Sequence, residues 1–215
     1  MNTTTIEGTT VQAVTAVTFT VPALRELAAA TVAAGKDDTL PTLTGVRVEW
    51  SKGLVRFVTT DRYRLAVIEY AHEDTGCEHE GAVLVPAKEL AAYVKGLPKT
   101  GRRSGGWERV VMVPGDGEVT FTCDTPDGTV SRTIRTLDGE FPKYRTLIPG
   151  EDKLAPVGDI SCNPSYLADV AKMPARAKHD PVTVTFSGDN KPMLWTGEGV
   201  CTSWTYLLMP IRKAR

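Results

Sequence analysis

The 215-residue sequence lacks the defining features of several protein classes. No apolar run approaches the roughly 20 residues that span a bilayer, which excludes a helical membrane protein. The four cysteines, Cys77, Cys123, Cys162 and Cys201, lie far apart and show no paired spacing, so a disulfide framework is not expected and a reducing cytoplasm is favoured. The first residues are threonine-rich and acidic rather than basic, unlike a signal peptide. Residues 1–16 are expected to be a short leader, or to include a first edge strand around Thr10 to Val14.

Motifs of common enzymes are also missing. There is no Gly-rich phosphate loop, no Gly-x-Ser-x-Gly elbow and no His-Glu-x-x-His. His72, Cys77 and His79 lie close together, but their spacing matches no standard zinc pattern and no fourth ligand is evident. A variable surface loop is the favoured interpretation of that segment. The sequence therefore predicts a protein that is not an enzyme and that needs no metal or cofactor.

What the sequence does contain is an internal repeat. Residues 17–28 (VTFTVPALRELA), 83–91 (VLVPAKELA) and, more loosely, 159–168 (DISCNPSYLA) each place a strand-like segment before a proline and an Ala/Leu-rich stretch. Proline suits the first helical position, because its missing N–H is not needed there. Asn163, directly before the third proline, is a good N-cap. Three helices at equivalent places in the repeat are therefore predicted.

After each predicted helix come alternating segments separated by turn signals, which is the pattern of antiparallel strands. Expected strands, in chain order, cover residues 46–50, 54–60, 64–70, 109–113, 117–123, 129–136, 182–186, 192–196 and 203–210. The repeating unit is thus strand–helix–strand–strand–strand, present three times. With 41% hydrophobic and 24% charged residues, an ordinary soluble globular protein is expected. The fold class predicted is α+β, with antiparallel sheets covered on one face by helices.

The net charge of −1 hides an uneven distribution. Residues 86–109 carry six basic and two acidic side chains, and residues 164–179 carry three basic and one acidic. On a helical wheel Lys88 and Lys95 project together, opposite Leu90, Val94 and Leu97. This pattern is typical of a solvated helix face, and it equally suits a surface that faces phosphates without reading base sequence. Charge alone does not decide between the two.

Three segments carry a resemblance to a known family. Residues 59–66 (TTDRYRLA) resemble the Thr-Asp-x-x-Arg-Leu-Ala signature in the middle domain of bacterial sliding clamps, the beta subunit of the replicative polymerase. Residues 138–145 (DGEFPKYR) resemble the segment linking the middle and last domains, and residues 206–212 (YLLMPIR) are similar to the C-terminal strand of that family. Residues 40–46 (LPTLTGV) also look like the middle domain.

The resemblance implies a surface pocket that accepts short linear peptides from DNA polymerase and other replication proteins. By position, its residues here are Leu43, Thr60, Arg62, Tyr63, Arg64, Leu65, Pro142, Thr146, Leu147, Leu207, Leu208, Met209, Pro210, Ile211 and Arg212. An apolar floor with a few polar groups is suited to such a ligand. Thr146 departs from the pattern, because the family usually has a second arginine there.

The resemblance also implies that the helices face double-stranded DNA and touch its phosphates without sequence preference. The candidate DNA-binding residues are Arg25, Lys88, Lys95, Lys99, Arg102, Arg103, Lys172, Arg176 and Lys178. A clamp loader is a possible further partner, no membrane is implied, and a homo-oligomer is expected because a ring needs several units.

The implied organisation is a shortened clamp. Residues 17–137 resemble the middle domain with its two units, residues 138–156 form a linker, and residues 157–215 resemble the second half of the last domain. An odd number of units does not obviously preserve the alternating orientation of units in a ring. Two functions therefore remain open: a processivity factor that holds DNA and tethers a polymerase, or a clamp-like decoy or adaptor that binds the same peptides without encircling DNA.

Overall fold

The computed structural model describes residues 16–71, 79–98 and 108–211, and it contains three copies of one unit. The first unit consists of β1 (Val17–Thr20), α1 (Val21–Leu27), the 3-10 helices η1 (Ala28–Ala33) and η2 (Pro41–Thr44), β2 (Gly45–Ser51), β3 (Leu54–Thr60) and β4 (Arg64–Ala71). The second consists of β5 (Gly81–Pro86), α2 (Ala87–Gly96), β6 (Arg109–Pro114), β7 (Glu118–Thr125) and β8 (Gly128–Arg135).

The third unit follows a linker that contains the 3-10 helices η3 (Tyr144–Leu147) and η4 (Glu151–Lys153). It consists of α3 (Pro164–Leu167), the 3-10 helix η5 (Ala168–Lys172), β9 (Thr183–Phe186), β10 (Met193–Glu198) and β11 (Ser203–Leu208). The predicted α+β class is confirmed, and the nine strands that follow the helices lie within two residues of their expected bounds. The expected leader falls outside the described residues, except for its last residue.

Side-chain caps explain where two of the helices begin. The Oγ1 atom of Thr20 accepts the N–H of Ala23 at 3.2 Å, and proline follows within the first turn of α1. The Oδ1 atom of Asn163 accepts the N–H of Ser165 at 2.9 Å, which confirms the N-cap predicted there. Each cap satisfies a backbone donor that the first helical turn leaves without an intrahelical partner. In the described residues no helix has the length and apolar character needed to cross a membrane.

The first two units exchange strands. β1 of the first unit pairs with β6 of the second, and β5 of the second pairs with β2 of the first, all antiparallel. The result is a four-stranded sheet in the order β1-β6-β7-β8 and a larger sheet in the order β5-β2-β3-β4-β11-β10-β9. Each of these two units therefore depends on the other for one strand, and the pair forms a single interlocked body.

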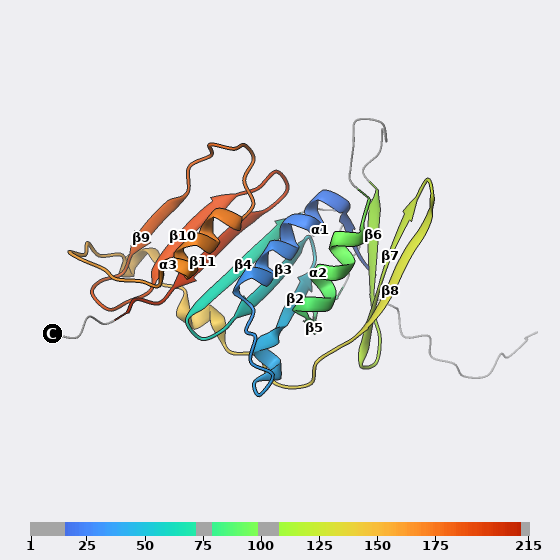
Figure 1. Ribbon diagram of the computed structural model, residues 1–215, viewed down its shortest axis with the longest axis horizontal. Helices are drawn as coiled ribbons and strands as arrows, with labels where there is room; N and C mark the ends of the chain where they lie inside the picture. The colour runs from blue at the N-terminus through green and yellow to red at the C-terminus, as the bar shows by residue number, and fades with distance from the viewer. Residues whose placement is uncertain (1–15, 72–78, 99–107, 212–215) are drawn as a thin grey trace, which may run out of the picture.

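The third unit joins this body edge to edge. β11 lies antiparallel to β4 over six residue pairs, from Ser203 opposite Glu69 to Leu208 opposite Arg64. Figure 1 shows the resulting continuous sheet, with β9 at one end of the molecule and the four-stranded sheet at the other. α1 and α3 cover the same face of this sheet, so the helices of the first and third units lie on one side.

Strand alternation divides the apolar side chains between two clusters. The larger cluster lies under the helices and includes Phe19, Leu24, Phe57 and Leu208, all at most 1% exposed. The smaller cluster lies on the opposite sheet face, where Leu65 and Leu207 pack against Phe141 and Tyr144 of the linker. Because neighbouring strand residues point to opposite faces, Leu207 and Leu208 belong to different clusters. The linker therefore covers the face that the helices leave free.

One expected element is not formed. The segment 159–162 was predicted to be strand-like, as the first segment of the third repeat, but it belongs to no sheet in the structure. β1 and β5 are strands because each has a partner in the neighbouring unit. Among the described residues the third unit has no such neighbour, so its first segment has no ladder to join.

Candidate functional site

A cavity of about 520 Å³ opens where β4 meets β11, on the sheet face covered by the linker. It is lined by residues from both strands, from the linker and from the β9–β10 turn: Thr60, Arg62, Arg64, Leu65, Thr146, Leu147, Ile148, Pro149, Lys153, Ser187, Asn190, Lys191, Pro192, Leu207 and Met209. Eight of the fifteen residues expected at the peptide pocket are among them, namely Thr60, Arg62, Arg64, Leu65, Thr146, Leu147, Leu207 and Met209.

The floor of this cavity is apolar and buried. Leu65 and Leu207 lie opposite each other in the β4–β11 ladder and are only 2% and 3% exposed. Leu147 and Met209 line the same cavity and are 52% and 40% exposed, so two large apolar side chains are accessible beside the buried floor. A buried floor with exposed apolar walls offers contact area to a ligand without requiring the core to open.

The β3–β4 turn shapes one wall. The Oδ1 atom of Asp61 accepts the N–H groups of Tyr63 and Arg64, both at 3.0 Å, and so braces the turn as expected of this residue. Arg62 takes a φ of 79°, in the left-handed region that few non-glycine residues adopt. Its side chain is exposed and lines the cavity. The N–H of Met209 donates to the carbonyl of Tyr63 at 2.8 Å, which joins the turn to the end of β11.

Arg64 lines the cavity but is already engaged. Its Nε donates to Oδ2 of Asp61 at 2.9 Å, a terminal nitrogen is paired with Asp169, and the guanidinium lies 4.3 Å from the centre of the Tyr166 ring. Burial by itself would lower the pKa of Arg64, but the two carboxylates more than offset it and the pKa is raised. Arg64 therefore connects the first unit to the third through an ion pair with Asp169 and a cation–π contact with Tyr166.

The linker wall is held by Glu49, a residue that sequence reasoning did not single out. Glu49 is 8% exposed, and its carboxylate accepts bonds from Arg47 at 2.6 Å, the Tyr144 hydroxyl at 2.9 Å and Arg145 at 2.5 Å. Burial alone would raise the pKa of Glu49, but these donors more than offset it and the pKa is lowered. Burial and Glu49 together raise the pKa of Tyr144 to about 12. This anchor fixes η3, whose last residues form the wall of the cavity.

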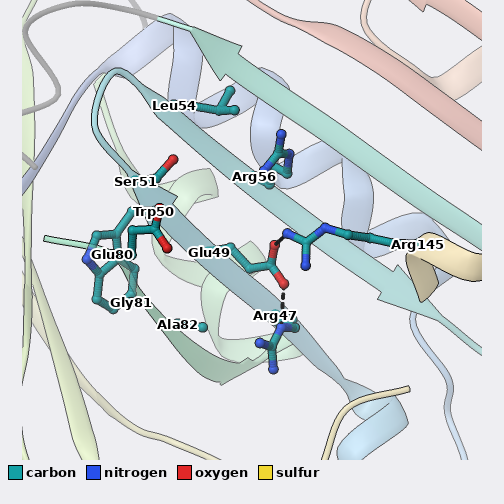
Figure 2. Close-up of a pocket in the computed structure, with 10 residues that line it drawn as sticks. All are labelled: Arg47, Glu49, Trp50, Ser51, Leu54, Arg56, Glu80, Gly81, Ala82 and Arg145. Carbon is teal, nitrogen blue, oxygen red and sulfur yellow. Dashed lines mark hydrogen bonds and ion pairs between the residues drawn. The ribbon is translucent and has the colours of Figure 1, made fainter. Parts of the chain in front are cut away.

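A second cavity, of about 410 Å³, opens around the same glutamate and is drawn in Figure 2. Its arginines are already paired: Arg47 and Arg145 converge on Glu49, and Arg56 is paired with Glu69 of the neighbouring strand β4. Glu80, which also lines the cavity, is exposed. We therefore assign this region a structural role in positioning the linker.

Six other residues expected at the pocket do not line the cavity: Leu43, Tyr63, Pro142, Leu208, Pro210 and Ile211. Leu208 is fully buried under the helices, because strand alternation points it away from Leu207. Leu43 is 8% exposed, within η2. Tyr63 stacks on Tyr166 of α3, with ring centres 6.4 Å apart. These six residues therefore lie outside the lining of this cavity, and their part in peptide binding stays a prediction. Arg212 lies outside the described residues.

Seven lining residues were missed: Ile148, Pro149, Lys153, Ser187, Asn190, Lys191 and Pro192. The first three directly follow the linker motif, and their position after it was a signal that could have included them. The β9–β10 turn carried a turn signal only. Its place beside the cavity depends on β11 pairing with β4, which no local pattern specifies.

The candidate DNA-binding residues have different surroundings. Lys88 and Lys95 are exposed on α2, while Leu90, Val94 and Leu97 are buried, as the helical wheel predicted. Arg25 is half-buried and donates to the carbonyls of Leu97 and Pro98, at 2.7 and 3.1 Å, so it closes the end of α2. Lys172 is paired with Asp169 at 2.6 Å, Arg176 is paired with Glu198, and Lys178 is exposed. Lys99, Arg102 and Arg103 lie outside the described residues.

No group of acidic, histidine or cysteine side chains in the described ranges could hold a metal ion. Two members of the cluster considered from the sequence, His72 and Cys77, lie outside these ranges.

Comparison with known proteins identifies the family. A protein-family model described as "DNA polymerase III beta subunit, central domain" matches residues 21–143, more than half of the chain. The chain therefore belongs to the family of bacterial DNA polymerase III beta subunits, the sliding clamps.

Individual relatives support this assignment over parts of their length. The chain is 38% identical over 120 residues to the beta sliding clamp of Streptomyces coelicolor, covering 56% of this chain and 30% of the relative. It is 35% identical over 135 residues to the beta sliding clamp of Micrococcus luteus, covering 63% of this chain and 41% of the relative. Thus the chain spans well under half the length of these relatives. The structure of the DNA polymerase sliding clamp from Bacillus subtilis matches with a TM-score of 0.73, 19% identity, and coverage of 97% of this chain and 67% of that one.

Proposed function

We propose that this protein is a sliding-clamp-like processivity factor whose cavity between β4, β11 and the linker captures short apolar peptides from DNA polymerase and other replication proteins. The proposal rests mainly on one observation: two exposed apolar side chains, Leu147 and Met209, line the cavity together with the buried Leu65 and Leu207. Membership of the sliding-clamp family supports this proposal.

The chemistry of the cavity favours an apolar anchor with a polar neighbour. Fully burying one aliphatic or aromatic side chain contributes roughly 1.5–3 kcal/mol, so two anchors suffice for a weak and reversible complex. Met209 can adapt its unbranched side chain to different anchors. Arg62 and Lys191 at the rim offer charge to an acidic or C-terminal group of the peptide.

The test is binding of a fluorescent peptide with aliphatic and aromatic anchors, followed by anisotropy. Met209→Asp places a charge against the apolar floor and should weaken binding at least about tenfold. Val200→Asp is the matched control, because Val200 is also an exposed apolar residue, at 60%, but does not line the cavity. Equal affinities of the two folded variants would refute the assignment of the cavity.

The second half of the proposal concerns DNA. Lys88 and Lys95 project from α2 on the side opposite its buried residues, where phosphates are attracted without base recognition. Replacing both by alanine should reduce the salt dependence of DNA association by roughly one unit of log–log slope per lysine. A double variant at Lys52 and Lys143, which are exposed in the β2–β3 turn and the linker, is the control. Retention on nicked circular DNA but loss from linear DNA distinguishes an encircling clamp from a non-encircling adaptor.

A further inference from the structure

The first two units show how a unit of this kind is completed. In each, the first strand after the helix, β2 or β6, is covered along its edge by the strand that precedes the other unit's helix. β5 covers β2 from Gly45 opposite Pro86 to Trp50 opposite Gly81, and β1 covers β6 from Val17 opposite Met112 to Thr20 opposite Arg109. Neither pre-helix strand pairs with the first post-helix strand of its own unit. Each of the two neighbouring units therefore supplies the strand that covers the open sheet edge of the other.

The third unit carries the same two parts, and both are left open. β9 corresponds to β2, since residues 181–187 (PVTVTFS) align with residues 45–51 (GVRVEWS). β9 is the end strand of its sheet, and its one described contact on the open side is a bridge at its end, where Ala155 donates to the carbonyl of Phe186 at 2.8 Å. The pre-helix segment 159–163 lies outside any sheet, and its Ser161 carbonyl accepts the N–H of Ile211 at 2.7 Å.

The exposure of corresponding valines in the first and third units shows the effect of the missing partner strand. Val46 in β2 is fully buried, whereas its counterpart Val182 is 43% exposed. Val48 is fully buried as well, while its counterpart Val184 is only half-buried. The same residue type at the same place in the repeat thus changes from core to surface. Figure 1 shows why: β9 forms the outer edge at its end of the molecule, while β2 has β5 beside it.

We propose that a second copy of this chain completes the third unit. Two third units pack about a two-fold axis, and each lays its segment 159–163 along the open edge of the other's β9. The first two units of the chain supply the reason for choosing a second copy as the partner. A unit whose pre-helix segment joins no sheet and whose β2-type strand ends a sheet is complementary to another such unit. Two identical copies satisfy both needs at once, as an isologous contact requires.

The two-fold relation proposed here has a precedent in the first two units. Within the chain, the first and second units face each other as two halves of one body, and a two-fold contact between third units repeats that relation. The alternation of units therefore continues from one chain into the next. The inference concerns the β9 end of the molecule and is independent of the peptide cavity.

The test begins with the mass of the chain by sedimentation equilibrium over a range of concentrations. We expect species of at least twice the chain mass of 23.3 kDa. Val182→Asp places a charge where the composite body would bury an apolar side chain, and the mass should fall to that of one chain at concentrations where the unmodified protein is associated. Val200→Asp is again the control, because that exposed valine lies in the β10–β11 turn and not in β9 or in the segment 159–163, and association should persist.

A second variant guards against misfolding. The carbonyl of Phe186 points to the open side, so the N–H of Val184, two residues earlier, points the same way. Val184→Pro removes that donor without breaking the β9–β10 ladder and should also abolish association.

Hydrogen exchange should show protection of residues 159–163 and 182–186 that increases with concentration. A monomeric parent protein overturns the proposal, and so does an assembly that both folded variants leave intact. Peptide affinity should be the same in Val182→Asp, which separates this inference from the proposed pocket.

Discussion

β2 and β9 hold the same place in their units and yet have different environments. β2 lies between β3 and β5, and its valines are fully buried, whereas β9 is an edge strand in which no residue is fully buried. The difference does not come from residue type, because residues 46–50 (VRVEW) and 182–186 (VTVTF) both alternate valine with polar residues and place an aromatic at the fifth position. It comes from the presence or absence of a complementary unit. A repeat of this kind specifies half of a core and relies on its neighbour for the other half.

The largest expected effect tests that contrast with paired truncations. Phe57 of β3 is fully buried and packs edge-to-face on Phe19 of β1, with ring centres 6.0 Å apart. Phe57→Ala should lower the free energy of unfolding by about 3–5 kcal/mol, because it leaves a cavity between the helices and the sheet. Phe186→Ala in the half-open unit should cost about 1 kcal/mol, because part of that side chain is already hydrated. Urea titration of both variants measures the difference, and equal losses would contradict the contrast.

A smaller effect is expected at the junction of the two regions. Arg64 and Asp169 come from the first and third units, are both at most 9% exposed, and form an ion pair across the β4–β11 seam. Among the described residues, Arg64→Met leaves the buried Asp169 with the exposed Lys172 as its remaining ion-pair partner, which should cost about 3 kcal/mol. The loss should appear as faster hydrogen exchange in β9, β10 and β11, with β6, β7 and β8 unchanged. Uniform acceleration across both sheets would show that the third unit does not open separately.

The two regions also differ in how far the sequence predicts them. Strand and helix positions follow from local periodicity and from prolines such as Pro22 and Pro164, so most elements could be expected. The absent strand at 159–162 could not, because its formation depends on a partner edge and not on its own residues. Only about half of the expected pocket residues line the cavity, because the lining also depends on which strands pair. Leu207 and Leu208 are equivalent as sequence, and only the pairing of Leu207 with Leu65 decides which one faces the linker.

Arg64 illustrates the other limit of sequence reasoning. Its motif placed it correctly beside the cavity, but one of its two carboxylate partners, Asp169, lies 105 residues later in the chain. Glu49 was missed because a single glutamate in an alternating strand reads as a solvated residue. Only the return of the linker over β2 buries it and makes it an anchor. Residues that connect distant segments are thus the ones that a single sequence hides.

The smallest expected effect concerns this anchor, which joins the linker to the interlocked body. The pKa of Glu49 is lowered in the folded protein from its ordinary value of 4.5, so its contribution is complete above that value and is lost as the pH falls through the lowered one. Glu49→Gln should cost about 1 kcal/mol at neutral pH, since Arg145 is largely exposed and its share is screened. The variant should also remove the part of the acid-induced loosening that is specific to residues 144–148. Hydrogen exchange of these residues at neutral and acidic pH measures both effects. An unmodified protein whose linker exchanges equally at the two pH values, after correction for intrinsic rates, would show that η3 is held by its apolar contacts with Leu65 and Leu207 and not by the carboxylate.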